Sequence, residues 1–357
     1  EVEKTRLWGA LAATLLVAAC GGSSNVTSGS AAASGSTPTK LAFNADGTPN
    51  LKGLTIHLGN SAGDATMGDT VVYLTVEELK KWGADADMTN GAGNTTDLAV
   101  ISGQLNATAG PLATVLNAGL DIFGNNQVHV DYLMVSGKIA DLASLKGKTV
   151  AIATAVSPDN YLLDGALAKA GLSRNDIKIA ITGSNGNSVN QLAQGKVDVA
   201  FVHADALTNL QKNGTMNVIA NGATLEPWDA DTFMAATPDW LKANPATAEA
   251  IDLAWLHAAY VFDNQKSAWV QAAVAYTKNA ITADEASTGY DALAKAQPWP
   301  ADGTGMETAN LQQNYDAANK SGQIKGQGSR SLSEWLVSAP WTAAVAYFKK
   351  HPKAIEA

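Results

Sequence analysis

From residue 52 onward, short runs of β-branched and apolar residues alternate with polar segments and then with amphipathic stretches of helical periodicity. A strand, a polar cap and a helix closed by glycine form a βα unit, and repeated units of this kind build a largely parallel sheet. Six units are readable, with strands predicted at 54–58, 85–88, 104–109, 149–153, 177–181 and 197–202. The pattern therefore predicts an α/β fold.

The unit around residue 150 has the clearest signals. Residues 149–153 are almost continuously apolar, which is typical of a strand buried on both faces. Ser157 and Pro158 open a predicted helix at 158–170, and Gly171 ends it. After about residue 233 the pattern changes to long alanine-rich helices, predicted at 245–263, 265–279, 282–296 and 306–319. We expect these later helices to cover and join the sheet.

The first twenty residues have a different pattern. Lys4 and Arg6 precede an apolar run at 7–19 that is too short to cross a bilayer as a helix, which is typical of a secretory signal. The run ends in Val-Ala-Ala-Cys-Gly, which resembles the lipobox of bacterial lipoproteins. The resemblance implies that residues 1–20 form a lipoprotein signal and that acyl chains on Cys20 hold the protein on a membrane. An ordinary buried cysteine is the alternative.

Residues 21–49 are rich in Gly, Ser, Ala and Thr, which predicts a flexible tether. A folded body on such a tether would work at the cell envelope, outside the cytoplasm. We therefore expect an extracytoplasmic protein that is anchored to the membrane by lipid.

Composition narrows the classes of function. The chain has 357 residues, of which 46% are hydrophobic and 16% charged, so disorder is excluded as the main state. Its formal net charge of −9 excludes the basic footprint of a nucleic-acid binder. Cys20 is the single cysteine, which excludes intramolecular disulfides and cysteine-rich zinc sites. The five histidines show no metal-binding spacing, so we expect no metal and no other cofactor.

Four stretches resemble, in order and spacing, the bacterial solute-binding proteins of the nitrate, taurine and alkanesulfonate ABC importers, which include binders of thiamine-pyrimidine precursors. The stretches are 139–152, 162–172, 191–200 and 239–245. The resemblance implies the two-lobed type II periplasmic binding protein fold, with two hinge crossings near 135–138 and 225–231. The first lobe would comprise 50–137 and 230–357, and the second 138–229. A ligand bound between the lobes would act by hinge closure, which a membrane permease recognises.

Candidate binding residues follow the predicted strands, because a ligand of an open parallel sheet lies beyond the strands' carboxyl ends, where helix N-termini offer N–H groups. Ser157 is the strongest candidate, as a ligand contact, a helix cap or both. His203 either hydrogen-bonds a ligand or is satisfied at its strand end, and Asp205 is most simply a cap. Asp64 would repel an anion, so it faces water or receives a cationic group. The full ligand-binding set is Ser61, Ala62, Asp64, Asn94, Thr95, Gly110, Pro111, Thr154, Ala155, Ser157, Asn185, His203 and Asp205.

The scarcity of arginine bears on the ligand. Only Arg6, Arg174 and Arg330 occur, so a bidentate arginine clamp is excluded unless Arg330 reaches the site. An anionic ligand would then be held by amides and hydroxyls. A neutral or partly aromatic ligand is almost equally allowed, and some of the nine tryptophans could stack on it.

The favoured function is that of a monomeric, lipid-anchored solute-binding protein that captures a sulfonate, nitrate or related small organic anion and delivers it to an ABC permease. Two alternatives are a binder of a neutral or aromatic heterocycle, such as a thiamine-pyrimidine precursor, and a sensor module that presents its ligand to a receptor. Enzymes of this fold that form pyrimidines or degrade thiamine need a cysteine nucleophile or a cysteine-rich metal motif. Once Cys20 is acylated the chain has neither, so we expect no enzyme.

Overall fold

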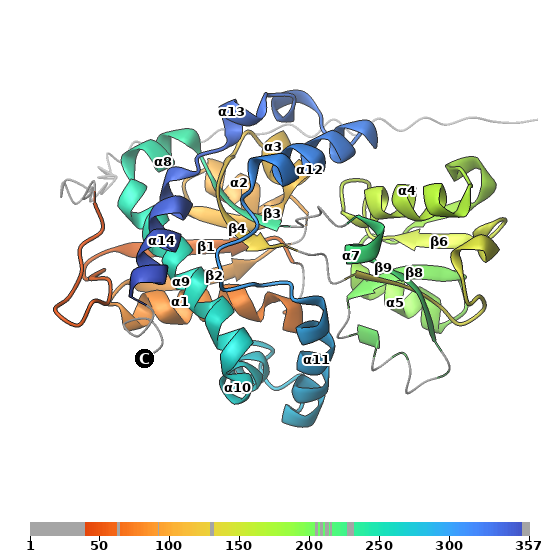
Figure 1. Cartoon of the computed structure of the whole chain (residues 1–357), viewed down its shortest axis with the longest axis horizontal. Helices are drawn as coiled ribbons and strands as arrows, with labels where there is room; N and C mark the ends of the chain where they lie inside the picture. The colour runs from red at the N-terminus through yellow and green to blue at the C-terminus, as the bar shows by residue number, and fades with distance from the viewer. Residues whose placement is uncertain are drawn as a thin grey trace, which may run out of the picture. The chain divides into compact units, whose positions relative to one another are not determined.

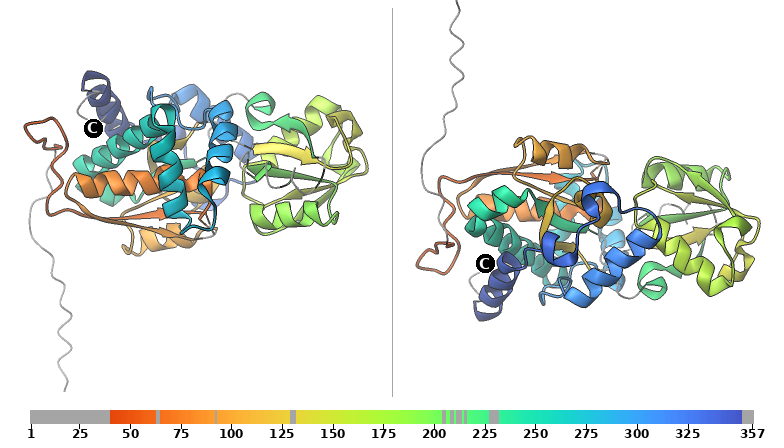
Figure 2. Two further views of the ribbon diagram at one scale, coloured as in Figure 1. Left: turned by 90° about the horizontal axis from the view of Figure 1, so that it is seen from below. Right: turned by 90° about the horizontal axis from the view of Figure 1, so that it is seen from above.

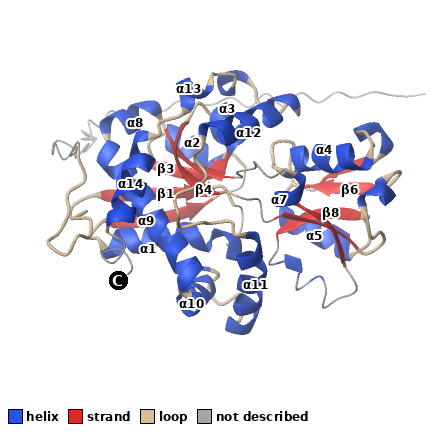
Figure 3. Ribbon diagram, viewed as in Figure 1, coloured by secondary structure: helices blue, strands red, loops and turns tan. Residues whose placement is uncertain are grey.

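The computed structural model describes residues 40–62, 65–91, 93–128, 132–203, 206–207, 210, 214, 216–226 and 232–351. Their strands form two five-stranded sheets with flanking helices (Figure 3). The first sheet has the order β2-β1-β3-β10-β4, and the second has the order β7-β6-β8-β5-β9. We call the parts built on these sheets the first lobe and the second lobe. The predicted α/β two-lobed fold is confirmed.

The strands that form the first sheet are β1 (Thr55–Asn60), β2 (Asp85–Asn90), β3 (Ala107–Pro111), β4 (Asp121–Gln127) and β10 (Thr232–Ala236). The second sheet contains β5 (Tyr132–Ser136), β6 (Thr149–Ile152), β7 (Lys178–Ile181), β8 (Val199–His203) and β9 (Asn217–Asn221). Strands β1, β2 and β3 pair in parallel, as do β6, β7 and β8. In each sheet one strand, β10 or β5, runs antiparallel to both neighbours. Both sheets are therefore mixed.

The first crossing between the lobes differs from its prediction. Strand β5 pairs with β8 and β9 of the second sheet. The chain therefore leaves the first sheet between Gln127 and Tyr132, before the predicted interval of 135–138, and the first segment of the first lobe ends before residue 137. It returns between Leu225 and Thr232, where the second crossing was predicted.

Helices cover both sheets (Figure 1). In the first lobe these are α1 (Thr70–Lys81), α2 (Thr95–Ile101), α3 (Leu112–Asn117), α8 (Pro238–Ala243), α9 (Pro245–Asn264), α10 (Lys266–Tyr276), α11 (Ala283–Ala296), α12 (Thr308–Lys320), α13 (Leu332–Trp335) and α14 (Ala339–Lys350). The second lobe has α4 (Asp159–Ala170), α5 (Asn185–Ala193) and α7 (Gly222–Leu225). The four long helices predicted after residue 233 correspond to α9, α10, α11 and α12.

The first lobe has one large core. Helix α9 packs against α1 and α14, and Figure 2 shows these helices side by side. Trp255, Trp269, Trp299 and Trp335 are completely buried in this core. All the other described tryptophans also belong to this core or pack against it, so these rings act in packing rather than as a platform for a ligand.

The second sheet separates two smaller cores. Val150 and Ile152 of β6 belong to one cluster, and Ala151 between them belongs to the other. Phe201 and Val202 of β8 divide in the same way. Successive side chains of a strand point to opposite faces, so a strand covered on both faces must be apolar throughout. This explains the continuous apolar run that predicted β6.

Candidate functional site

An inner cavity of about 230 Å³ lies where strand ends of the two sheets meet. The first lobe supplies one wall from the loops after β1 and β3 and from the end of β4, and the second lobe supplies the other from the loops after β6, β7 and β8. The polar side chains that line the cavity are Asn60, Ser61, Thr66, Asp69, Thr114, Asn126, Gln127 and Thr232 from the first lobe and Tyr132, Thr154, Ser157, Ser184, Asn185 and His203 from the second. Hydroxyls and amides dominate this set.

The loop after β6 is tied to the buried carboxylate of Asp159, at the start of α4. The Ala153 N–H donates to Asp159 Oδ2 at 2.6 Å, and the Ser157 hydroxyl bonds the other carboxylate oxygen. The Thr154 N–H donates to Ser157 Oγ at 2.9 Å. Burial raises the pKa of Asp159 to about 6, although these hydrogen bonds and the nearby His203 oppose the rise. The carboxylate thus fixes the position of the loop that faces the cavity.

Ser157 has a different role from the predicted helix cap. Pro158 occupies the N-cap position of α4, and the Ser157 hydroxyl has its partners in Thr154 and Asp159. Ser157 is nearly buried, yet it lines the inner cavity. Its side chain therefore holds the loop in shape at the cavity wall.

Three side chains of the second wall contact one another. The Asn185 Nδ2 group donates to the Tyr132 hydroxyl at 2.7 Å and lies 2.9 Å from His203 Nε2. The Tyr132 and His203 rings lie 4.5 Å apart, because the two residues are direct partners across the β5–β8 ladder. Asn185 Oδ1 is buried and has no hydrogen-bond partner among the described residues. A buried polar atom without a partner is rare in folded proteins, so an N–H or O–H group of a ligand is a natural partner for this oxygen.

The first wall contains a network of amides and a carboxylate. Asn60 Nδ2 donates to Asn90 Oδ1 at 3.3 Å across the β1–β2 pair, and the Tyr276 hydroxyl donates to the same oxygen at 3.1 Å. Asp69 Oδ2 accepts the Thr66 hydroxyl proton at 2.6 Å. Burial raises the pKa of Asp69, while its bonds to Thr66 and Asn60 and the nearby His203 oppose the rise. Asp69 is the acidic side chain at this surface.

Asn126 extends the first wall from the end of β4. Its Nδ2 group donates to the Thr232 hydroxyl at 2.8 Å. Its Oδ1 atom is buried without a hydrogen-bond partner among the described residues, and its backbone carbonyl accepts the Trp255 indole N–H at 3.3 Å. The large core of the first lobe therefore reaches the inner cavity through Asn126.

No lysine or arginine is among the described residues that line the inner cavity. Arg174 binds Asp164 and the Asn160 carbonyl, and Arg330 binds Asp121 and the Leu120 carbonyl. Neither guanidinium lines the cavity, so a ligand there would meet hydroxyls, amides, the His203 imidazole and the Asp69 carboxyl group.

The structure brings part of the predicted set together. Seven predicted residues line the inner cavity, namely Ser61, Ala62, Pro111, Thr154, Ser157, Asn185 and His203. Asn94, Thr95, Gly110 and Ala155 do not line it. Asn94 precedes α2 without a side-chain cap bond, and Gly110 lies behind Ser61, where an added Cβ would stand 3.4 Å from Ser61 Oγ. Asp64, Asp205 and Cys20 fall outside the described residues.

Sequence patterns did not reveal several polar lining residues, which are Asn60, Thr66, Asp69, Thr114, Asn126, Gln127, Tyr132, Ser184 and Thr232. Asn60 and Ser184 immediately precede the predicted Ser61 and Asn185, so a wider window after each strand would have included them. Asp69 and Asn126 carry no such signal, because neither follows a predicted strand.

Neither a metal centre nor a membrane span is present in the part of the chain that the structure describes. This part contains no cluster of three or more His, Cys, Asp or Glu side chains that could hold a metal ion. None of its helices combines the length and the apolar character that a membrane span requires.

Comparisons with known proteins agree with this architecture. Residues 94–252 match the family model described as "ABC transporter, phosphonate, periplasmic substrate-binding protein". A search of curated protein sequences finds no match.

Among solved structures, the periplasmic nitrate-binding protein NrtA from Synechocystis PCC 6803 is similar at a TM-score of 0.67 and 13% identity, over 86% of this chain and 92% of that one. The alkanesulfonate-binding protein SsuA from Xanthomonas axonopodis pv. citri, bound to MOPS, gives 0.64 and 15%, over 81% and 99%. The ligand-binding component of an ABC-type import system from Staphylococcus aureus gives 0.66 and 11%, over 82% and 99%. The predicted fold and the predicted resemblance to solute-binding proteins of ABC importers are confirmed.

Proposed function

We propose that this protein, which has the fold of the solute-binding components of ABC importers, captures a small polar molecule outside the cytoplasm and delivers it to a membrane permease. The observation that carries the proposal is the inner cavity, because strand ends of both sheets supply its walls. Ligands of open α/β sheets bind at this position. A ligand held by both walls would favour a closed arrangement of the lobes, which a permease can distinguish from the open one.

We propose a small oxyanion of the sulfonate, nitrate or phosphonate type as the ligand. The hydroxyl groups of Ser61 and Thr154 at the cavity supply hydrogen-bond donors for such an anion. Asp69 opposes an anion less than an ordinary carboxylate would, because burial raises its pKa and a protonated carboxyl group can donate a hydrogen bond. The matched family and the similar structures support this class of ligand.

A second candidate is a neutral polar ligand, such as a pyrimidine. The observation in its favour is the absence of lysine and arginine from the described lining, together with the presence of the Asp69 carboxyl group. An ionised Asp69 would accept a hydrogen bond from an N–H or O–H group of such a ligand and would repel an anion.

Thermal unfolding of the purified protein separates these two candidates. The panel contains methanesulfonate, nitrate, methylphosphonate and a neutral aminopyrimidine, each at pH 5 and pH 8. A ligand at one hundred times its Kd stabilises the folded state by about 2.7 kcal/mol, which raises the unfolding midpoint by several degrees. An anion should give the larger shift at pH 5, where Asp69 is more fully protonated. No shift with any member at either pH would contradict both candidates.

We further propose that Cys20 is acylated and anchors the protein through the tether at 21–49. The support is the sequence of the signal and its resemblance to a lipobox. Replacement of Cys20 by serine should move the protein from the membrane fraction to the soluble extracytoplasmic fraction, because two acyl chains hold a protein stably and none does not. An unchanged membrane fraction would contradict acylation at Cys20.

Transport is also preferred to catalysis. The Ser157 hydroxyl bonds the Thr154 carbonyl and Asp159, so it does not form the serine–histidine pair of a serine nucleophile. A sensor would bind the same ligands, so uptake of a labelled ligand by cells with and without this protein decides between transport and signalling.

A further inference from the structure

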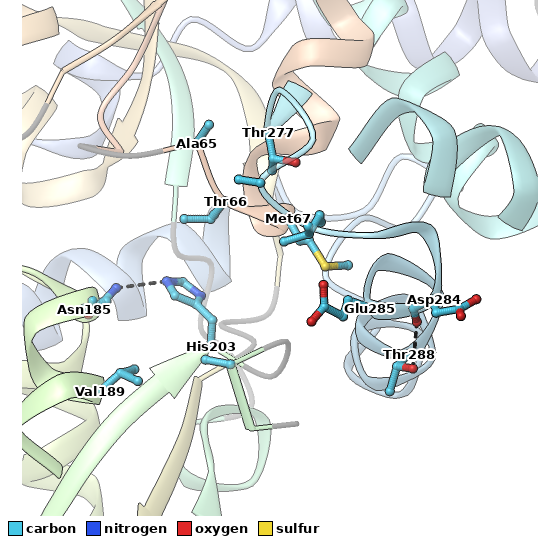
Figure 4. A pocket seen from close by; sticks show the side chains of 14 residues that line it. Ala65, Thr66, Met67, Asn185, Val189, His203, Thr277, Asp284, Glu285 and Thr288 are labelled. Carbon is cyan, nitrogen blue, oxygen red and sulfur yellow. Dashed lines mark hydrogen bonds between the residues drawn. The ribbon is translucent and has the colours of Figure 1, made fainter. Parts of the chain in front are cut away.

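A second cavity of about 350 Å³ adjoins the inner one, and we call it the outer cavity (Figure 4). Its lining includes Met67, Val189, Ile281, Ala280, Asp284 and Glu285. The two cavities share Thr66, Asn185, Gly186 and His203, so they meet at these four residues. Figure 4 shows the contact between Asn185 and His203 at this junction, with Thr66 and Met67 across from it.

The two cavities differ in chemistry. Hydroxyls and amides dominate the polar lining of the inner cavity, whereas the outer one has an apolar wall of Met67, Val189, Ile281 and three alanines. Met67 is nearly buried in the large core of the first lobe, and Ile281 packs against the same core. Val189 packs against one of the small cores of the second lobe. The apolar wall is therefore anchored in both lobes and offers a fixed surface to an apolar group.

Carboxylates stand at the end of the outer cavity formed by α11. Asp284 is exposed, and Glu285 Oε2 accepts the Thr282 N–H and hydroxyl proton, both at 3.0 Å, which fixes the Glu285 side chain. No lysine or arginine is among the described residues that line this cavity. The negative potential of two carboxylates disfavours a second anionic group on a ligand and tolerates an uncharged or cationic one.

The sizes of the cavities point the same way. Pockets for small molecules usually measure roughly 300–1,000 Å³, so the inner cavity of about 230 Å³ suits a head group rather than a larger molecule. The outer cavity of about 350 Å³ offers space for an attached chain.

We propose that the outer cavity is a tail subsite, and that the ligand is an elongated molecule with a polar head in the inner cavity and an apolar tail whose end is uncharged or cationic. This proposal rests on the proposed function, because the head must bind in the inner cavity. It adds that the tail contributes affinity and that the carboxylates of α11 disfavour a negative charge on the tail.

Titration calorimetry with two series of probes tests the subsite. The sulfonate series is methanesulfonate, butanesulfonate and 4-sulfobutanoate, and the phosphonate series has the same three tails. Each fully buried methylene strengthens binding about fourfold, so the three extra methylenes of the butyl compound can add roughly sixtyfold, and we expect it to bind about tenfold more tightly than the methyl compound. The carboxylated tail should lose most of this gain.

Variants locate the effect. Ala280→Trp fills the apolar wall, so the ratio between the butyl and methyl Kd values should fall to about one. Ala283→Trp is the matched control, because Ala283 is also exposed, stands three residues away and lines neither cavity. Asp284→Asn should recover a few-fold of the affinity that the carboxylated tail loses.

The outcomes separate the two proposals. If methyl probes bind and the butyl probes bind no more tightly, the tail subsite is wrong while the proposed function stands. The tail subsite is also wrong if Ala283→Trp abolishes the chain-length gain as fully as Ala280→Trp. If no probe of either series binds, an anionic head is wrong and the subsite falls with it. The chain-length series on the unaltered protein decides the question even if a tryptophan variant does not fold.

Discussion

The two lobes share one spatial order of strands but differ in how their loops are held. In the first sheet, the parallel strands β2, β1 and β3 are followed by the antiparallel strand β10 and then by β4. In the second sheet, β7, β6 and β8 are followed in the same way by the antiparallel strand β5 and then by β9. The first lobe buries its sheet under long helices such as α9, whereas the second lobe relies on two small cores. The comparison shows that the same strand order provides one wall of the inner cavity in each lobe, while the two lobes stabilise their walls by different means.

Buried carboxylates show the same contrast. Asp97 in α2 of the first lobe is fully buried, and neither of its oxygens has a hydrogen-bond partner among the described residues. Asp159 of the second lobe is equally buried, but it accepts bonds from Ala153 and Ser157. Burial raises the pKa of Asp97 to about 7 and that of Asp159 to about 6. The Asp159 carboxylate therefore fixes the position of a loop, whereas the Asp97 carboxylate holds no other group among the described residues in place.

The largest expected effect concerns the two kinds of core. Trp255→Ala should destabilise the protein by about 4 kcal/mol, because it opens a large cavity in the core and removes the bond to Asn126. Leu163→Ala, in a small core of the second lobe, should cost about 3 kcal/mol. Urea unfolding followed by circular dichroism measures both changes.

Tryptophan fluorescence sharpens this test, because every described tryptophan belongs to the first lobe. If the two lobes unfold separately, Leu163→Ala should lower the midpoint seen by circular dichroism more than the midpoint seen by fluorescence. Equal shifts by both probes would show that the lobes unfold as one unit.

The next effect is the pH dependence caused by Asp97. Its folded-state pKa of about 7 lies above its ordinary value of 3.8, so the folded protein holds this proton more tightly than the unfolded chain does. The protonated Asp97 side chain therefore stabilises the folded state fully below about pH 4, and this stabilisation is lost as the pH rises to about 7. Asp97→Asn should stabilise the protein by on the order of 3 kcal/mol at pH 8 and much less at pH 4. Urea unfolding at both pH values measures it, and equal effects would refute the assignment.

The same substitution at Asp159 should have the opposite consequence for the site. An asparagine cannot accept from both Ala153 and Ser157 as the carboxylate does, so the loop at 153–157 should loosen. We expect Asp159→Asn to weaken ligand binding about tenfold, with a smaller effect on unfolding. Asp164→Asn, on the same helix but paired with Arg174, is the control and should leave the Kd unchanged. A tenfold loss in the control as well would indicate a general change in α4.

The smallest expected effect is that of Ser157→Ala. It removes a hydroxyl that bonds Thr154 and Asp159 but keeps the other bond of the loop, from Ala153 to Asp159. We expect a two- to fivefold loss of affinity, since a net hydrogen bond is worth about 1 kcal/mol. Calorimetry measures the Kd, and an effect larger than that of Asp159→Asn would reverse the order of importance in this wall.

The repeated units were predictable from sequence because their signals are local. Strand β6 and helix α9 have continuous apolar or helical patterns, and each predicted helix after residue 233 appears. Strand β4 gave no such pattern, since Gly124, Asn125 and Asn126 occupy its buried centre. Strands β5 and β10 are antiparallel insertions that follow each crossing of the chain, so their partners are distant in sequence.

The site was predictable only where it follows a strand. Ser61, Thr154 and Asn185 were predicted because a polar residue after an apolar run marks the carboxyl end of a strand, and all three line the inner cavity. Asp69 and Asn126 reach the same cavity through a short helical turn and a polar strand, whose placement depends on tertiary packing. Asp159 was missed because its role depends on burial, which one sequence does not reveal.

Hydrogen exchange with and without a ligand identified by thermal unfolding tests the central claim most directly. The claim is that residues of both lobes contact one ligand bound in the inner cavity. It predicts slower exchange on binding at the amides of 60–61 in the first lobe and of 153–157 and 183–187 in the second, with little change on the far side of either sheet. Protection confined to one lobe, or absent from all three segments, would contradict the account.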